Sequence, residues 1–367
     1  MQYDKLRICH VIGSLRIGGA EKLYVHLLNE IDVDLKDALL LTSNKNGKLL
    51  NELSANVNIH YQPVKFLFSP YYIIKLAMYF RKKEFNVVHA HMFWASFYAV
   101  LAAKLAGIPV VFTTEHGMNP WKKQWHYFIE HYLITPFSDM RICVSKDILE
   151  NRHNKDRLPI NKLHFIPNGI SKNKYKPRHY SKGVIKLLAA GRFIEAKDYE
   201  TLIDAAKKLQ KKNIDFILNI VGDGELFPVI SNKVSEYGLS DVVKLQGVQS
   251  NVIDWMYDAD IFVMSSKREG QPIVILEAMS TGLPIVSTSV GGIPDTLENN
   301  KDALLVKSEN AELLANAINK LVNNNELANK LGYSAYNKMI ENFSINAIST
   351  KLCSMYFKVL SEKKTNV

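Results

Sequence analysis

Residues 261–279 read IFVMSSKREGQPIVILEAM, and this stretch decides the fold. Its apolar start, Ile261 to Met264, predicts a short buried strand. Pro272 suits the first turn of a helix and Gly282 suits its C-terminal end, so we expect a helix to follow the polar loop of residues 265–271. Strand, loop and helix in this order form the unit from which parallel α/β sheets are built.

The same alternation of β-branched runs and helical periodicity extends along the chain. It predicts strands at Leu6–Ile12, Asp37–Leu41, Val87–Ala90, Val110–Thr114, Met140–Val144 and Leu163–Ile166, and then at Ile185–Ala190, Phe216–Val221, Val242–Gln246, Ile261–Met264, Pro284–Ser287 and Ala303–Val306. Residues 171–183 are rich in Lys and poor in apolar residues, as in a linker. We therefore expect an α/β protein with two Rossmann-like domains, residues 1–170 and 184–344, and a linker at 171–183. A length of 367 residues suits two such domains.

Composition excludes several classes of protein. With 47% apolar and 22% charged residues, the chain is not disordered, collagen-like or a coiled coil. Cys9, Cys143 and Cys353 are far apart and odd in number, which fits neither a disulfide framework nor a zinc motif. No signal peptide is expected, because Met1–Arg7 is polar and leads directly into a strand-like stretch. No transmembrane helix is expected, because the most apolar stretch, Met92–Thr114, is interrupted by Lys104 and by Gly107-Ile108-Pro109. These features predict a cytoplasmic location.

The net charge of +10 is distributed unevenly. Residues 1–180 carry 25 Lys and Arg against 14 Asp and Glu, whereas residues 181–367 carry 21 against 22. We therefore expect the first half to meet an anionic partner, either nucleic acid or an acidic membrane surface.

A glycine loop follows the first predicted strand, at the sheet edge where ligands of such folds bind. Residues 12–21 read IGSLRIGGAE, in which Gly18 and Gly19 allow close backbone approach and the following helix start favours an anion. The spacing is not Gly-x-Gly-x-x-Gly, which disfavours a nicotinamide cofactor. A tight strand-to-helix turn is the alternative interpretation of these glycines.

Charged residues follow two strands of the second half. Arg192 and Lys197 are five residues apart and suit a diphosphate, although each alone also fits a solvated surface charge. Glu269 and Glu277 are eight residues apart, which is about 12 Å along a helix. Paired carboxylates of glycoside hydrolases lie only about 5–9.5 Å apart. We therefore expect these glutamates to bind sugar hydroxyls and a ribose rather than to act as acid and nucleophile.

Together these motifs resemble glycosyltransferase family 4. The resemblance rests on Gly18-Gly19-Ala20-Glu21, Arg192 with Lys197, Glu269 with Glu277, Val221-Gly222-Asp223-Gly224-Glu225 and Ile166-Pro167-Asn168-Gly169-Ile170, and covers residues 6–345. It implies a GT-B fold, two Rossmann-like domains facing across a cleft, with a C-terminal helix at residues 345–367 that packs back on the first domain. It also implies retaining transfer of a sugar from a nucleotide-sugar, with no essential metal or other cofactor.

The resemblance also implies a role for each site residue. Arg192 and Lys197 would bind the donor diphosphate, and Glu277 would bind the ribose. The sugar and phosphate would contact Glu269 and the backbone of Gly270, Gln271, Ile273 and Val274, while Gly19 would face the diphosphate and the acceptor. His116 would position the transferred sugar, with a hydrogen-bonded loop histidine as the alternative. The expected catalytic residues are therefore Glu269, His116, Arg192 and Lys197, and the departing phosphate oxygen would deprotonate the acceptor hydroxyl on the same face.

No metal site is expected. His89 and His91 lie on the same side of a strand but lack a third ligand at metal spacing, so packing or lining of the acceptor site is the expected role. Residues 32–34 and 258–260 both read as Asp-x-Asp, but Asp258 and Asp260 precede a strand, at the edge away from the ligands. Pro272 stands where many members of the family have Gly, which removes one backbone donor from the loop.

The acceptor side has the least specific sequence. Residues 66–85 and 121–137 combine aromatic residues with cations, which suits a face lying on anionic lipid, although an amphipathic core helix is the alternative. The cations are Lys65, Lys75, Arg81, Lys82, Lys83, Lys122 and Lys123. For the donor we expect a UDP-sugar that supplies a hexosyl or N-acetylhexosaminyl unit. The expected acceptor is a glycan or a polyprenyl-diphosphate-linked glycan of bacterial capsule or lipopolysaccharide assembly, and the expected location is peripheral, on the inner face of the plasma membrane.

Two other functions stay open at this point. A nucleotide-sugar epimerase of the same fold is not distinguished by fold alone. A basic nucleic-acid-binding module would explain the charge of the first half, but not the diphosphate motifs of the second.

Overall fold

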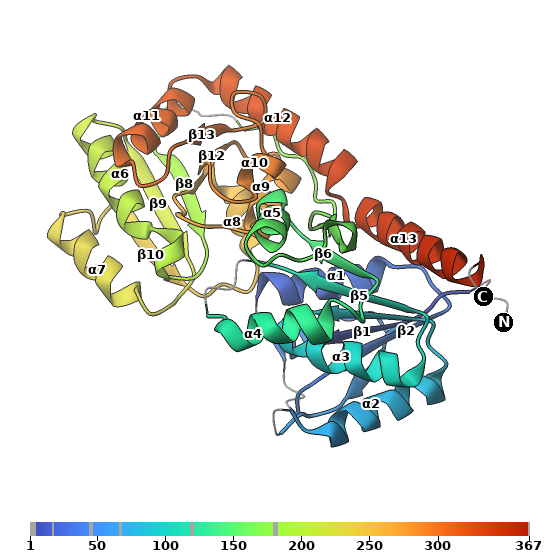
Figure 1. Ribbon diagram of the computed structural model, residues 1–367. Helices are drawn as coiled ribbons and strands as arrows, with labels where there is room; N and C mark the ends of the chain where they lie inside the picture. The colour runs from blue at the N-terminus through green and yellow to red at the C-terminus, as the bar shows by residue number, and fades with distance from the viewer. Residues whose placement is uncertain are drawn as a thin grey trace. The chain divides into compact units, whose positions relative to one another are not determined.

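The computed structural model describes residues 5–16, 18–43, 47–65, 68–117, 121–178 and 183–365 (Figure 1). The chain divides into two compact units. The first consists of residues 1–169 and 345–367, and the second of residues 170–344. Each unit contains one parallel sheet with helices on both faces, which confirms the predicted pair of α/β domains.

The first unit has a seven-stranded sheet in the order β3-β2-β1-β4-β5-β6-β7. Helices α2, α3 and the π-helix η2 cover one face, and α1 and α13 pack together on the other (Figure 1). The strands are β1 (Arg7–Ile12), β2 (Leu35–Leu40), β3 (Asn58–Tyr61), β4 (Val87–His91), β5 (Val110–Glu115), β6 (Met140–Cys143) and β7 (Leu163–Phe165). The helices are α1 (Gly19–Glu30), η1 (Lys48–Glu52), α2 (Pro70–Lys83), α3 (Phe93–Ala106), α4 (Gln124–Ile129), η2 (Glu130–Ile134), α5 (Lys146–Asn154), η3 (Ile160–Lys162) and α13 (Ile345–Thr365).

The second unit has a six-stranded sheet in the order β10-β9-β8-β11-β12-β13. Helices α6, α7 and α11 bury their apolar sides on one face, and α8, α9 and α12 do so on the other. The strands are β8 (Ile185–Ala190), β9 (Phe216–Val221), β10 (Val243–Gly247), β11 (Ile261–Met264), β12 (Ile285–Thr288) and β13 (Leu304–Val306). The helices are η4 (Glu195–Lys197), α6 (Tyr199–Lys211), α7 (Phe227–Glu236), α8 (Val252–Asp258), α9 (Ile273–Thr281), α10 (Ile293–Thr296), α11 (Ala311–Val322) and α12 (Asn325–Asn342).

The C-terminal helix α13 belongs to the first unit, as predicted. Its Tyr356 is fully buried, and the phenol oxygen lies 2.5 Å from His89 Nδ1 in β4. Near its end, Lys363 Nζ lies 2.5 Å from Asp139 Oδ1 and donates to the carbonyl oxygen of Pro109. The chain therefore leaves the first unit after Gly169 and returns to it at Ile345.

Two features differ from the sequence analysis. Strand β3 was not expected, because it is a four-residue strand at the sheet edge with half-exposed side chains and thus lacks an apolar run. Residues 171–178 of the expected linker pack on the second unit: Lys176 N–H donates to the Thr281 carbonyl oxygen, and the Arg178 side chain is buried. The rest of the expected linker, except Gly183, lies outside the described residues. No helix in the described part of the chain is both long and apolar enough to cross a membrane.

Candidate functional site

An ion pair joins the carboxyl ends of two neighbouring strands in the second unit. Lys197, after β8, places its Nζ 2.6 Å from Oε1 of Glu269, after β11. Both side chains are mostly buried, 18% and 10% exposed, and the Ser266 hydroxyl donates to the same Oε1 at 2.6 Å. The sequence assigned Lys197 and Glu269 to one site, and the structure brings them into direct contact. Because both contacts go to Oε1, no residue in the described part of the chain bonds to Oε2, which can accept a hydrogen bond from a ligand.

Gly291 holds the backbone of Glu269 in place. A Cβ at Gly291 would lie 1.8 Å from the Glu269 carbonyl oxygen, and φ at Gly291 is +52°. The next residue, Gly292, donates its N–H to the Gly270 carbonyl oxygen at 2.8 Å. The sequence analysis missed this pair, although two glycines between a strand and a helix are the same signal as Gly18-Gly19.

A second close backbone approach shapes the loop that carries Arg192 and Lys197. A Cβ at Gly222 would lie 1.9 Å from the Gly191 carbonyl oxygen, so the loops after β8 and β9 touch through their main chains. The Arg192 side chain is exposed and makes no hydrogen bond or ion pair to the other described residues. It is therefore available to an anion, whereas Lys197 is already bound to Glu269.

Helix α9 begins next to Glu269. No side chain of the described residues caps its N-terminus, where Pro272 precedes Ile273. The first backbone N–H groups, including those of Ile273 and Val274, can therefore bind an anion. The Gln271 side chain instead turns inward, because its Nε2 donates to Thr296 Oγ1 at 3.0 Å. The Nε2 group of Gln271 is therefore already engaged within the protein. Glu277, one turn into the helix, shares a face with Ile273 and is largely buried.

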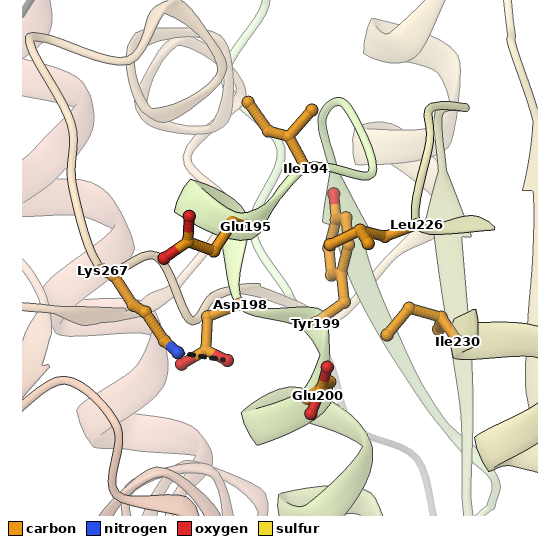
Figure 2. A pocket seen from close by; sticks show the side chains of 8 residues that line it. All are labelled: Ile194, Glu195, Asp198, Tyr199, Glu200, Leu226, Ile230 and Lys267. Carbon is orange, nitrogen blue, oxygen red and sulfur yellow. Dashed lines mark ion pairs between the residues drawn. The ribbon is translucent and has the colours of Figure 1, made fainter. Parts of the chain in front are cut away.

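A pocket lies beside the loop that carries Lys197, but neither Lys197 nor Glu269 lines it (Figure 2). Its floor includes Asp198, which caps α6 and lies 3.7 Å from Lys267 Nζ. The lining residues are Ile194, Glu195, Asp198, Tyr199, Glu200, Leu226, Ile230 and Lys267. The pocket has three carboxylates, Glu195, Asp198 and Glu200, and one lysine, Lys267. This excess of negative charge would repel a diphosphate, so the pocket is not suited to the predicted donor phosphates.

In the first unit, the glycine loop leads into α1 as predicted. Gly18 precedes the helix, and its carbonyl oxygen accepts the Lys22 N–H at 3.0 Å. A Cβ at Gly18 would lie 2.3 Å from Glu21 Oε2, so the Glu21 carboxylate folds back on the helix start. Gly19 is the first helical residue. The loop thus combines a helix N-terminus with an acidic residue that already occupies part of it.

His116, which is partly buried, ends a row of histidines whose other members are buried. His10 Nδ1 lies 3.1 Å from His91 Nε2, and His91 Nδ1 lies 3.2 Å from His116 Nε2. Neighbouring His89 contacts Thr114 Oγ1 through Nε2 at 2.6 Å instead. Burial lowers the pKa of all four rings, to about 3 in His10 and to about 4 in His116.

The structure corrects the expectation that His89 and His91 have no third partner. His10 pairs with His89 across β1 and β4, and one nitrogen of each of the three rings lies within 4.8 Å of the others. The His89 and His91 rings are stacked, with centroids 4.4 Å apart and planes inclined by 23°. Lone pairs in such nearly parallel planes do not converge on a point about 2.0–2.1 Å from each nitrogen, as zinc requires. The rings as placed do not fit a metal ion.

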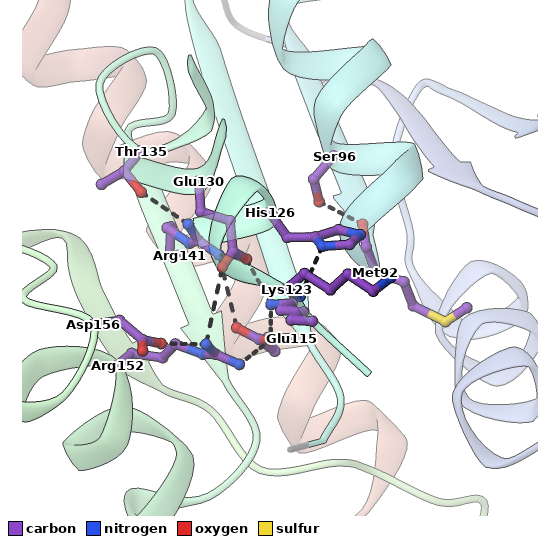
Figure 3. A network of polar contacts seen from close by, with 11 residues as sticks. Met92, Ser96, Glu115, Lys123, His126, Glu130, Thr135, Arg141, Arg152 and Asp156 are labelled. Carbon is purple, nitrogen blue, oxygen red and sulfur yellow. Dashed lines mark hydrogen bonds and ion pairs between the residues drawn. The ribbon is translucent and has the colours of Figure 1, made fainter. Parts of the chain in front are cut away.

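A buried ion network lies on the other face of the β5 end (Figure 3). Glu115 Oε1 is 2.8 Å from Lys122 Nζ and 2.6 Å from Arg152, and Glu130 Oε1 is 2.7 Å from Lys122 and 3.0 Å from Arg141. Burial alone would raise the pKa of Glu115, but Lys122, Arg152 and Arg141 hold it at about 2. Lys122 is 1% exposed, so its assignment to a lipid-facing surface was wrong. The sequence does not show that Lys122 pairs with Glu115 and Glu130.

An exposed apolar surface does lie on the two segments expected to face lipid. Phe68, before α2, contacts Trp125 of α4, with ring centroids 5.8 Å apart, and thereby joins the two segments. We call this surface the aromatic face, and define it by Phe68, Tyr71, Ile74, Met78, Trp121, Trp125, Phe128 and Tyr132, which are 39–65% exposed. Exposed Lys65, Lys75, Arg81, Lys82 and Lys123 lie on the same segments. Residues 66 and 67 lie outside the described part of the chain.

Comparison with known proteins identifies the family. Residues 171–338 match the family described as Glycosyl transferases group 1, and residues 17–174 match Glycosyltransferase Family 4. A UDP-Gal:alpha-D-GlcNAc-diphosphoundecaprenol alpha-1,3-galactosyltransferase of Escherichia coli is 24% identical, with 98% of this chain and 99% of the relative aligned. An uncharacterized glycosyltransferase of Methanocaldococcus jannaschii is 31% identical, with 76% of this chain and 78% of the relative aligned.

Solved structures share the fold. A glycosyltransferase from Rickettsia africae has a TM-score of 0.82 at 20% identity, covering 98% of this chain and 99% of that one. Anabaena Alr3699/HepE in complex with UDP has a TM-score of 0.82 at 18% identity, covering 96% and 100%. The chain is therefore a glycosyltransferase of family 4 with the two-domain GT-B fold.

Proposed function

We propose that the protein transfers a hexosyl or N-acetylhexosaminyl unit from a UDP-sugar to a lipid-linked glycan of bacterial polysaccharide assembly, with retention of configuration. The observation that carries the proposal is the Lys197–Glu269 ion pair beside the uncapped start of α9. It places a cation, a carboxylate and open backbone N–H groups at one sheet edge. These are the groups needed for a diphosphate and the sugar attached to it.

In this proposal the second unit stabilises the leaving group. Lys197, the exposed Arg192 and the first N–H groups of α9 bind the diphosphate, and Oε2 of Glu269 accepts a hydrogen bond from a sugar hydroxyl. Glu277 binds the ribose. Groups placed where negative charge develops usually supply the largest share of catalysis. The buried contacts of Glu269 with Lys197 and Ser266 suit a positioned acceptor of hydrogen bonds better than a free nucleophile.

The reaction then proceeds on one face of the sugar. The bond between the anomeric carbon and the phosphate oxygen breaks, and the acceptor hydroxyl oxygen bonds to the same carbon from the same side. The departing phosphate oxygen takes the hydroxyl proton, so UDP leaves as the second product. His116 positions the sugar by its ring or its backbone carbonyl, and we expect no metal ion to be required.

The uridine and lipid assignments draw on the relatives. The E. coli relative is named for UDP-Gal and a diphosphoundecaprenol-linked sugar, and the Anabaena structure contains UDP. The aromatic face supports a lipid-linked acceptor, because residues 61–83 contain five Lys and Arg and no Asp or Glu. Aromatic side chains at the interface and cations near lipid phosphates are the usual means of peripheral binding. We therefore propose that the protein works on the inner face of the plasma membrane.

The test supplies radiolabelled UDP-glucose, UDP-galactose and their N-acetylamino forms to vesicles that contain undecaprenyl-diphosphate-linked GlcNAc. We expect one donor to label the organic-extractable lipid, with equimolar UDP release, an anomeric configuration equal to that of the donor, and full activity in EDTA. Interconversion of UDP-sugars without transfer would indicate an epimerase. Salt-dependent oligonucleotide binding without any turnover would indicate a nucleic-acid-binding module.

A further inference from the structure

Met92, directly after β4, holds a backbone conformation that side chains rarely adopt. Its φ is +70° and its ψ is 166°. This combination lies in a region of backbone space that is populated almost only by glycine, so any side chain there is strained. Glu84 and Asp198 also have positive φ, but with ψ of 41° and 50° they lie in the ordinary left-handed helical region. The strain at Met92 is therefore larger than at those two residues.

Hydrogen bonds hold the backbone of Met92 on both sides. Its N–H donates to the Thr114 carbonyl oxygen at 3.1 Å. Its carbonyl oxygen accepts the Ser96 N–H at 3.0 Å and the Ser96 hydroxyl at 2.7 Å (Figure 3). The residues before and after it, His91 and Phe93, are both buried. The surrounding structure thus fixes Met92 in its strained conformation, which is the condition under which such strain persists.

Packing does not account for a side chain at this position. Met92 is 37% exposed, although both of its neighbours along the chain are buried. Its side chain points away from the buried ion network (Figure 3). Glycine would adopt the same conformation without steric cost and would keep the three hydrogen bonds, because they use only the backbone atoms of this residue. The methionine side chain therefore adds strain while a third of it stays outside the core, which indicates a functional contact.

The place of Met92 in the sheet is where ligands of open parallel sheets bind. The strand order places β1 beside β4, and the chain continues from these two strands to opposite sides of the sheet. The usual ligand crevice lies outside the carboxyl ends of such a pair. Because Val11 pairs with Ala90, residue 13 and Met92 lie level at this edge. A Cβ at Gly13 would have no other atom within 4 Å, so the space at Gly13 is open.

We propose that the Met92 side chain contacts the sugar ring of the acceptor and determines how tightly that sugar binds. A thioether makes no strong hydrogen bond but adapts to irregular apolar surfaces, and the C–H groups on one face of a pyranose ring form such a surface. His116, the residue proposed to position the transferred sugar, follows the adjacent strand β5. The sugar end of the acceptor therefore lies at Met92, and its lipid end lies on the aromatic face. This inference rests on the proposed function, in which the acceptor is a lipid-linked glycan.

The first test measures the strain without any substrate. Met92→Gly and Met92→Ala both remove the side chain beyond Cβ, but only alanine keeps the strained Cβ. We therefore expect Met92→Gly to unfold at a higher urea concentration than Met92→Ala. Met78, an exposed methionine inside α2, is the matched control, and there the glycine variant should unfold at the lower concentration. A lower midpoint for Met92→Gly than for Met92→Ala would overturn the inference.

The second test measures the acceptor contact. Transfer of labelled sugar is followed at varied concentrations of undecaprenyl-diphosphate-linked GlcNAc and of the UDP-sugar donor. Met92→Gly should raise KM for the acceptor about tenfold or more and leave KM for the donor unchanged. Met92→Leu keeps an apolar side chain of similar volume and should recover most of the acceptor affinity. A purely structural role does not predict a higher acceptor KM in the more stable of the glycine and alanine variants.

Glu84→Gly is the control for removal of a side chain at positive φ. Glu84 ends α2 and precedes β4, so it lies at the amino ends of the strands, away from the ligand edge. Its acceptor KM should equal that of wild type. An equal rise of KM in Glu84→Gly and Met92→Gly would show a general effect on the fold and refute the contact.

The remaining outcomes separate this inference from the proposed function. If the wild type labels no lipid-linked acceptor, the proposed function fails and the acceptor contact fails with it. If the wild type is active and Met92→Gly keeps the wild-type KM for the acceptor, the proposed function stands and the contact with Met92 is refuted.

Discussion

Lys197 Nζ lies 2.6 Å from Glu269 Oε1 and thereby joins the carboxyl ends of β8 and β11. In the proposed function the ammonium group binds the donor diphosphate and the carboxylate binds its sugar, and in the structure each neutralises the charge of the other. On this proposal Lys197 can donate to a diphosphate without leaving Glu269, since an ammonium group has three donors. The carboxylate would then already be oriented for the sugar.

The first prediction concerns the cations of this site. Arg192→Ala and Lys197→Ala should each lower kcat/KM at least tenfold, ~1.4 kcal/mol of barrier, because each removes positive charge from the leaving diphosphate. Lys186→Ala is the matched control, since its ion pair with Asp258 is half exposed and lies at the amino end of β8 rather than after its carboxyl end. Steady-state UDP release measures all three. Equal rates in wild type and both site variants would refute the assignment.

The second prediction concerns Gly291. Gly291→Ala should lower the free energy of unfolding by about 1–2 kcal/mol, because alanine is strained in a left-handed backbone conformation. It should also lower turnover, because the new Cβ would displace the Glu269 carbonyl. Gly238→Ala has a similar φ of +65° but open space around its Cβ, so it should lower stability and leave turnover unchanged. Urea denaturation and turnover are measured on both. Normal activity in Gly291→Ala would show that the Glu269 backbone tolerates displacement.

The third prediction concerns the buried ion network. Lys122→Met should lower the free energy of unfolding by about 3–5 kcal/mol, because it leaves Glu115 and Glu130 short of positive charge in a buried site. Lys123→Met, at the exposed neighbouring position, should change it by less than about 0.5 kcal/mol. Urea unfolding at pH 7 tests the pair. Similar losses in the two variants would contradict the burial of Lys122.

The pH dependence follows from the pKa of Glu115, which is about 2 in the folded protein. An unfolded glutamate has a pKa of about 4.3, so this carboxylate contributes full stability above that value and loses it as the pH falls toward 2. We therefore expect Glu115→Gln to destabilise the protein equally at pH 7 and pH 5, and less at pH 3. A difference between wild type and variant that grows as the pH falls would have the wrong sign.

The fifth prediction concerns the aromatic face. Replacing Phe128 and Tyr132, which are 60% and 57% exposed, with Ser should weaken binding to vesicles of anionic lipid about tenfold or more. Tyr333→Ser in the second unit, at 55% exposure, is the control and should bind as wild type does. Co-sedimentation at low and high salt measures the bound fraction. Unchanged binding in the double variant would show that the aromatic face does not bind the membrane.

Most of the fold could be predicted from the sequence. Every predicted strand is present, because strands of a parallel sheet are buried on both faces and read as short apolar runs. Strand β3 was not predicted, because its side chains are partly exposed and it has no apolar run. The pairing of Lys197 with Glu269 was foreseen only as a shared site, since spacing along the chain does not give a distance in space.

For other residues the sequence does not identify the contact partner, even where, as at Gly291, it marks a loop. Gly291 meets Glu269 through backbone atoms of separate loops, and Lys122 meets Glu115 and Glu130 inside the first unit. A lysine between aromatic residues looks the same whether it faces lipid or a buried carboxylate. His10 joined the other histidines only because β1 lies beside β4 in the sheet, which the order of residues along the chain does not show.

The most direct measurement of the central claim is calorimetric titration of the wild-type protein and of Lys197→Ala with UDP, ADP and GDP. Our account predicts saturable binding with preference for UDP, and at least a tenfold weaker affinity, ~1.4 kcal/mol, in the variant. Absence of UDP binding to the wild type, or equal affinity in the two proteins, would contradict it.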